Sequence, residues 1–187
     1  VYTRCVYEFD STVGYRYIPN TKGVSLSVSN GLPIRYEEFE IGPYANSGNS
    51  VTSWDSTDFR ILVFGDSFTS NLNAYHSWAE FIAEPLEKSL GRNVEVMNLA
   101  RTAFGVKQMV SLAAATTQKT KADLIVVAFI IDDLERAQTW RAQMNVEGRE
   151  RLFLTTQPSQ TPQPECRQDA DLIDPRITAE WCKNIVE

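Results

Sequence analysis

The stretch Arg60-Ile61-Leu62-Val63-Phe64-Gly65-Asp66-Ser67-Phe68-Thr69-Ser70 decides the fold of this chain. Its first part, with Phe59, is almost wholly apolar and stops at a glycine, which is typical of a buried parallel strand. A serine placed just past such a strand lies at the carboxyl edge of an open α/β sheet, where ligands bind. The alternative is an ordinary polar turn between a strand and a helix, and this stretch alone leaves both interpretations open.

A helix is predicted at 77–90, directly after this turn. Ser77 is a good N-cap, and Glu80 completes a capping box with it. Gly91 suits the left-handed position that ends many helices. Pro85 lies inside the helix and predicts a kink.

Further strand and helix patterns alternate down to residue 131. We expect strands at 94–99 and 124–131, with a helix at 106–119 between them. The expected apolar face of that helix consists of Val106, Met109, Val110, Ala113, Ala114 and Thr117. Strand 124–131 is apolar throughout and should lie centrally in the sheet. Helical crossovers imply right-handed βαβ units, so the predicted class is α/β with a parallel sheet.

Residues 1–58 carry few helix signals. Apolar and polar residues partly alternate from Tyr15 to Val28, Asn30-Gly31 is a strong tight-turn dipeptide, and 34–41 is expected to return as a second strand. Residues 42–58 look like a surface loop. We interpret 1–58 as an irregular, β-containing lead-in packed on a main domain at 59–187.

The alternation of strand and helix patterns ends after Asp133. Residues 134–173 are expected to form an insertion or flap, with Leu152–Thr155 in a hairpin whose turn lies near Gly148. Asp174-Pro175 is a favourable N-cap and first-turn pair, so a final helix is predicted at 174–187.

Composition excludes several function classes. The 187 residues carry a net charge of −6 with no concentration of Lys or Arg, which argues against nucleic acid as a partner. No apolar run is long enough to span a membrane. The chain begins at Val1, so we expect processing or trimming at the N-terminus that would have removed any targeting signal.

Metal and cofactor signals are weak. The single histidine, His76, and the absence of a Cys-x-x-Cys pair argue against a zinc site, and we expect no cofactor. Asp169, Asp171 and Asp174 could form a calcium site, but a solvated loop with one helix cap is the better interpretation of these residues. Cys166 and Cys182 can pair in an oxidising compartment, which would leave Cys5 over; three unpaired thiols remain the alternative.

Three predicted strand ends converge on one edge of the sheet. They end at Gly65-Asp66-Ser67, at Asn98–Arg101 with Gly105 opening the next helix, and at Asp132-Asp133. This layout suits acyl transfer, with Ser67 as nucleophile and the N–H groups of Ser67 and Gly105 facing an oxyanion. A plain helix-start glycine is the alternative for Gly105.

These residues resemble the SGNH (GDSL) family of ester hydrolases over about residues 8–187. Gly65-Asp66-Ser67 is similar to its first block, which carries the nucleophile, and Asn98 through Gly105 to its second. Asp132-Asp133 falls where the third block has Gly-Asn-Asp. The lead-in from Asp10 to Asn20 looks like that of one bacterial subgroup. The resemblance implies a flavodoxin-like, three-layer α/β/α sheet and an extracytoplasmic (periplasmic or secreted) protein.

Two departures from the family pattern concern the chemistry. Asp132 stands where the family has an Asn that donates to the oxyanion, and a carboxylate donates only when protonated. The family's Asp-x-x-His block is absent, and His76 is better explained as a surface or helix-entry residue. We expect that the chain is cut short and that the base lies beyond it. The predicted sheet is then incomplete, with an edge for further polypeptide or a protein partner to cover.

Three functional hypotheses follow. The first is an ester hydrolase or O-acyltransferase acting through Ser67 on a small-molecule or glycan ester. The second is a non-catalytic SGNH-like structural or binding subunit of a larger assembly. A flavodoxin-like nucleotide binder is weaker, because no Gly-rich phosphate loop is present.

Two sets of side chains have competing explanations. Tyr15, Tyr17, Trp54 and Trp140 suit packing better than a glycan site. Arg101 is expected to pair with Asp132 or Asp133 rather than with an anionic substrate.

Overall fold

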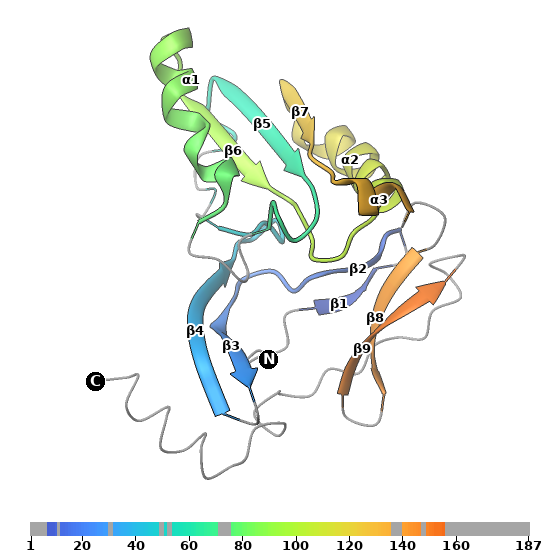
Figure 1. Ribbon diagram of the computed structural model, residues 1–187. Coiled ribbons are helices and arrows are strands. Elements are labelled where there is room, and N and C mark those ends of the chain that lie inside the picture. The colour runs from blue at the N-terminus through green and yellow to red at the C-terminus, as the bar shows by residue number, and fades with distance from the viewer. Residues whose placement is uncertain are drawn as a thin grey trace.

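The main domain is built on a three-stranded parallel sheet (Figure 1). The computed structural model describes residues 7–10, 12–29, 32–48, 51, 54–70, 76–135, 140–146 and 149–155. The strands are β5 (Phe59–Phe64), β6 (Val94–Asn98) and β7 (Leu124–Val127), in the order β6-β5-β7. Both pairings are parallel, with Ile61 opposite Val96 and Leu124. The predicted α/β class is therefore confirmed.

Side chains of β5 alternate between two buried layers. Ile61 and Val63 pack with Ala79, Val94 and residues of helix α1 (Ala83–Leu90). Leu62 and Phe64 pack on the other face, which helix α2 (Val106–Thr120) covers. The two helices lie on opposite sides of the sheet in Figure 1. Because the strand order reverses at β5, its carboxyl end lies at the kind of switch point where α/β proteins bind ligands.

The predicted helix at 77–90 is two elements. A 3₁₀ helix, η1 (Trp78–Phe81), precedes α1, and Ser77 and Glu80 form the predicted capping box. Pro85 has no N–H, and its ring would clash with the carbonyl of Phe81 in a continuous α-helix. The α-helix therefore restarts at Ala83, which places Pro85 in the first turn. Gly91 ends it with φ 62°, as expected.

Helix α2 matches its predicted range, but its predicted buried face is wrong at two of its six residues. Met109 and Ala113 are buried as expected, whereas Val110 is 52% exposed and Ala114 is also exposed. The buried Gln108 takes part instead, because it hydrogen-bonds two neighbouring segments. Contacts with the sheet and the lead-in thus determine which face of α2 is buried.

Strand β7 differs from its prediction in length. It covers four residues and lies at an edge of the three described strands, with Leu124 and Ile125 well exposed. The central strand is β5. The chain turns into a short helix, α3 (Ile131–Glu135), so Asp132 and Asp133 are helical residues rather than a strand end. The apolar run at 124–131 did not show that the strand ends at Val127.

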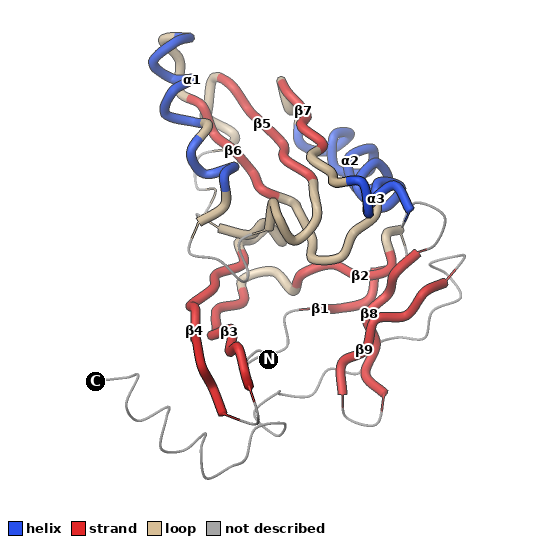
Figure 2. The backbone as a smooth tube through the Cα atoms, viewed as in Figure 1, coloured by secondary structure: helices blue, strands red, loops and turns tan. Residues whose placement is uncertain are grey.

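The lead-in contains two antiparallel pairs. Strands β1 (Tyr7–Asp10) and β2 (Gly14–Tyr17) form one, and β3 (Thr21–Ser29) and β4 (Leu32–Ile41) form the other, which is the predicted hairpin (Figure 2). The prediction that 42–58 is a surface loop is wrong for much of the segment. Its buried residues are Ala45, Asn46, Ser47, Val51, Trp54 and Thr57.

Strands β8 (Trp140–Val146) and β9 (Arg149–Thr155) form the predicted second hairpin, and β8 lies against β1 and β2. Gly148, Asn30 and Gly31 lie outside the described residues, as do all three cysteines and the predicted helix at 174–187. Within the described parts of the chain, no helix has the length and apolar character needed to cross a membrane.

Candidate active site at the carboxyl edge of the sheet

Ser67 lies at the apex of a tight turn that leaves β5. The turn begins at Gly65, where only glycine fits. A Cβ at this position would lie 2.6 Å from Thr69 Cβ and 3.0 Å from the Ala128 carbonyl oxygen. Asp66 is buried, and its Oδ1 accepts from the Phe68 N–H at 2.9 Å. Its carbonyl accepts from Thr69 and from Ser70. The turn therefore presents an exposed Ser67 on a rigid base.

The Ser67 backbone N–H is available to a ligand. Among the described residues, no group accepts a hydrogen bond from it, whereas the N–H groups of the next three residues all donate within the turn. An oxyanion formed at Ser67 Oγ would meet this donor, which costs no rearrangement of the protein.

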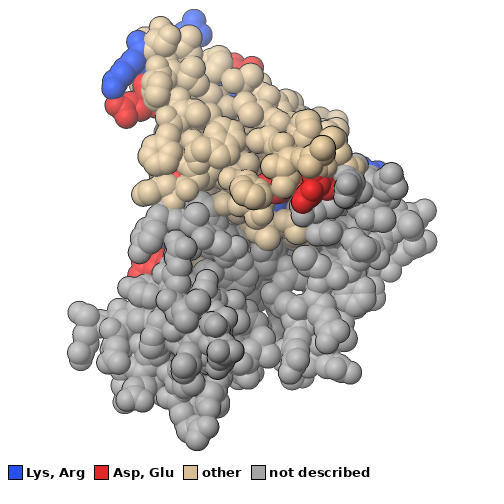
Figure 3. All heavy atoms as spheres, viewed as in Figure 1, with Lys and Arg blue, Asp and Glu red and all other residues tan. Residues whose placement is uncertain are grey.

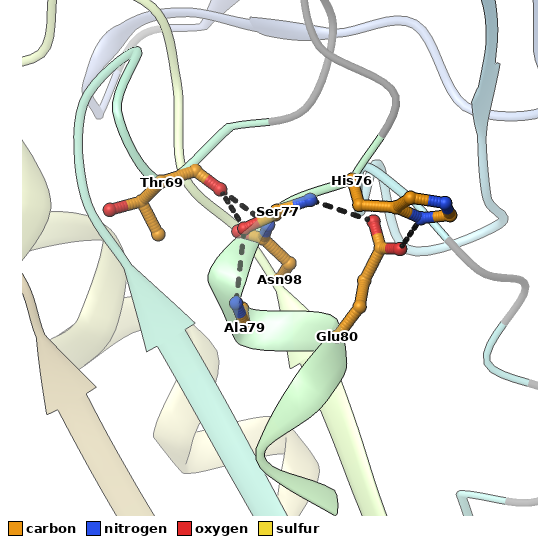
Figure 4. A network of polar contacts seen from close by, with 6 residues as sticks. All are labelled: Thr69, His76, Ser77, Ala79, Glu80 and Asn98. Atoms are coloured by element: carbon orange, nitrogen blue, oxygen red, sulfur yellow. Dashed lines mark hydrogen bonds and ion pairs between the residues drawn. The ribbon is translucent and has the colours of Figure 1, made fainter.

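Thr69 anchors the turn from behind, as Figure 4 shows. Its carbonyl oxygen accepts from Ser77 Oγ at 2.5 Å and from Asn98 Nδ2 at 2.7 Å. Asn98 is buried, and its Oδ1 accepts from the Ala100 N–H at 3.1 Å. One amide side chain thus holds the end of β6 against the Ser67 turn.

The lead-in reaches the same turn through Tyr17. The Tyr17 hydroxyl lies 2.8 Å from Ser70 Oγ in a buried hydrogen bond. The Arg101 guanidinium carbon lies 4.3 Å from the centre of the Tyr17 ring, and the Arg101 N–H donates to the Gly65 carbonyl at 2.9 Å. Residues from β2 and from the end of β6 therefore brace the turn together.

Gly105 is placed where the sequence predicted, but its N–H has a partner. It donates to Gln108 Oε1 at 3.2 Å, and Gln108 Nε2 donates to the Val13 carbonyl at 2.7 Å. As an oxyanion donor, Gly105 would first have to give up the Gln108 bond. Ala103, in the same loop, has a φ of 65°, a left-handed conformation that a non-glycine residue adopts only in a constrained turn.

Asp132 and Asp133 differ sharply in burial. Asp133 is fully buried, and its Oδ2 accepts from the Ile130 N–H at 3.0 Å, which closes the start of α3. Asp132 is exposed. The face drawn in Figure 3 is mostly uncharged over the sheet, with acidic atoms at the position of α3.

His76 lies at the entry to η1, and it is exposed. Its Nδ1 is 2.9 Å from Glu80 Oε2, and its ring contacts that of Phe81 edge-on. Glu80 uses its other oxygen to accept from the Ser77 N–H. The histidine thus extends the capping box, which agrees with its interpretation as a helix-entry residue.

The other expectations have mixed outcomes. Tyr15, Tyr17 and Trp54 are fully or almost fully buried, which confirms packing for these three, while the side chain of Trp140 lies outside what the structure describes. Pairing of Arg101 with Asp132 or Asp133 stays a prediction. In the described ranges, no group of three or more His, Cys, Asp or Glu residues is arranged to hold a metal ion.

A family model for GDSL-like lipases and acylhydrolases matches residues 61–166, more than half of the chain. The match begins inside β5 and includes the Ser67 turn, β6, α2, β7 and α3. The chain therefore belongs to this family, as its strand-end motifs suggested. Comparisons with curated proteins and with solved structures found no match.

Proposed function

We propose that this chain supports serine-dependent acyl-ester chemistry, as an ester hydrolase or O-acyltransferase. The observation that carries the proposal is the exposed Ser67, held past the central strand by a turn in which Asp66, Thr69 and Ser70 are buried. Membership of the acylhydrolase family supports the same reaction class.

In this proposal, Ser67 Oγ attacks the ester carbonyl and its proton passes to a general base. The carbonyl oxygen becomes an oxyanion beside the Ser67 N–H. The alcohol leaves, and water or an acceptor alcohol then takes the acyl group from Ser67. Within the described residues no hydrogen bond joins His76 to Ser67, and His76 instead extends the capping box through Glu80, so the proposal places the base outside the described residues.

Hydrolysis of p-nitrophenyl acetate by the full-length protein tests the proposal. We expect turnover that Ser67→Ala abolishes and that Ser89→Ala leaves unchanged, because Ser89 is an exposed residue of α1. Turnover equal in the two variants, with both folded by circular dichroism, would contradict it.

A second candidate is a non-catalytic binding or structural subunit. Two observations favour it: Asp132 offers a carboxylate where the family has an amide donor, and Gln108 accepts from the Gly105 N–H. On this account the native chain shows no Ser67-dependent turnover. Under the first proposal, Asp132→Asn instead increases turnover, because it puts an amide donor in place of a carboxylate at the position where the family has its Asn.

A further inference from the structure

A cavity of about 380 Å³ lies between the lead-in and helix α2, apart from the Ser67 turn. Its walls come from the β1–β2 turn, the segment at 44–45, the end of β6 and the second half of α2. This volume is within the range of about 300–1,000 Å³ that is usual for small-molecule sites. No residue of 65–70 lines it.

The interior of the cavity is apolar. Met97 and Leu99 line it from β6 and the loop after it, and Leu112 and Ala115 line it from α2. Met97 and Leu99 are buried in the core of the protein. A short hydrocarbon chain or ring placed there would lose its contact with water against a preformed apolar surface.

Basic residues from three separate elements line the same cavity. Arg16 comes from β2, Arg101 from the loop after β6, and Lys119 from α2. Arg101 is 1% exposed, and its guanidinium is oriented by the Tyr17 ring and by the Ala100 carbonyl, to which Nη1 donates at 2.9 Å. Arg16 and Lys119 are exposed, and a guanidinium has a donor geometry that matches the two oxygens of a carboxylate.

The lining of the cavity holds fewer acidic than basic residues. Asp10 is the acidic residue of the lining, and its Oδ1 already accepts from the N–H groups of Thr12 and Val13. The C-terminal carbonyls of α2 would also repel an anion. Two of them are engaged: Thr120 accepts from Trp54 Nε1, and Lys121 accepts from Arg60 Nη1.

We propose that this cavity binds a small amphipathic anion, with its carboxylate near Arg16 and Lys119 and its apolar tail over Leu112 and Ala115. The site is separate from Ser67 and stands whether or not the chain is an esterase. Arg101 joins it to the Ser67 turn, through the hydrogen bond from its backbone N–H to the Gly65 carbonyl and through the Tyr17 ring.

Calorimetric titration of the full chain with sodium hexanoate and with hexan-1-ol tests the proposal. The two probes share their tail and differ in charge. We expect hexanoate to bind about tenfold more tightly than the alcohol, because charge-assisted hydrogen bonds form only with the anion. Equal affinities, or no binding of hexanoate, would overturn the proposal.

Matched variants locate the binding. Arg16→Gln with Lys119→Gln should reduce hexanoate affinity about tenfold and leave hexan-1-ol unaffected, while Arg92→Gln, an exposed site outside the cavity, changes neither. Ala115→Phe should fill the cavity and abolish binding of both probes, whereas Ala114→Phe, on the exposed side of α2, should not. The double charge variant decides the matter if Ala115→Phe fails to fold. Hexanoate binding that both cavity variants leave intact would place the anion elsewhere and overturn the proposal.

Discussion

The side-chain amide of Asn98 joins two segments of the chain through hydrogen bonds. It donates to Thr69 on the Ser67 turn and accepts from Ala100 in its own loop. The sequence placed Asn98 at a strand end but did not predict this clamp, because Thr69 is far from it along the chain. Ser67 was predictable, since a local pattern of an apolar run followed by glycine marks where β5 ends.

The substitution Asn98→Asp tests the clamp. It keeps an oxygen for the Ala100 N–H but sets a carboxylate oxygen against the Thr69 carbonyl. We expect the free energy of unfolding to fall by at least about 1 kcal/mol, because a buried hydrogen bond is lost and a carboxylate is placed in a buried site. Urea denaturation measures this. Unchanged stability would mean that the Thr69 carbonyl needs only Ser77.

The element η1–α1 shows what local sequence signals can and cannot predict. The capping box, Pro85 and Gly91 were all recognisable, because each acts on its own backbone neighbours. The buried face of α2 was not, since hydrophobic periodicity carries no record of Gln108 bonding Val13. The short length of β7 was missed as well, because an apolar run does not show where strand pairing ends.

The N-cap residue of η1, Ser77, allows a test of how much a helix cap contributes to stability. Ser77→Ala removes the acceptor of the Ala79 N–H and a donor to Thr69. We expect a loss of about 0.5–2 kcal/mol of stability, typical of an N-cap. Ser89→Ala, within α1 and exposed, should change it by less than about 0.5 kcal/mol. Equal effects in thermal or urea unfolding would show that the cap contributes nothing.

At the scale of the whole molecule, the lead-in and the main domain share one core. Tyr15 and Tyr17 lie in the same buried cluster as Leu62 and Phe64 of β5. Tyr15 packs edge-on against Phe104 at 5.1 Å and its hydroxyl donates to the Thr102 carbonyl. Sequence patterns placed the lead-in hairpin correctly but not these contacts, because nothing local links Tyr17 to Ser70.

A double-mutant cycle on Tyr17→Phe and Ser70→Ala measures this link. Each single change leaves a buried partner unsatisfied, so the two costs should not add. We expect a coupling of about 1 kcal/mol between them. Tyr44→Phe, at an exposed tyrosine, paired with Ser70→Ala should show none. Strict additivity for Tyr17 and Ser70 would mean that the lead-in does not brace the turn.

The central claim is that Ser67 is a nucleophile presented by a rigid turn. Reaction of the folded full-length protein with a fluorophosphonate, followed by peptide mapping, tests it most directly. We predict a single adduct on Ser67, lost in Ser67→Ala and retained in Ser89→Ala. No adduct on Ser67 in the folded protein, or labelling spread equally over other serines, would contradict the claim and favour the non-catalytic subunit.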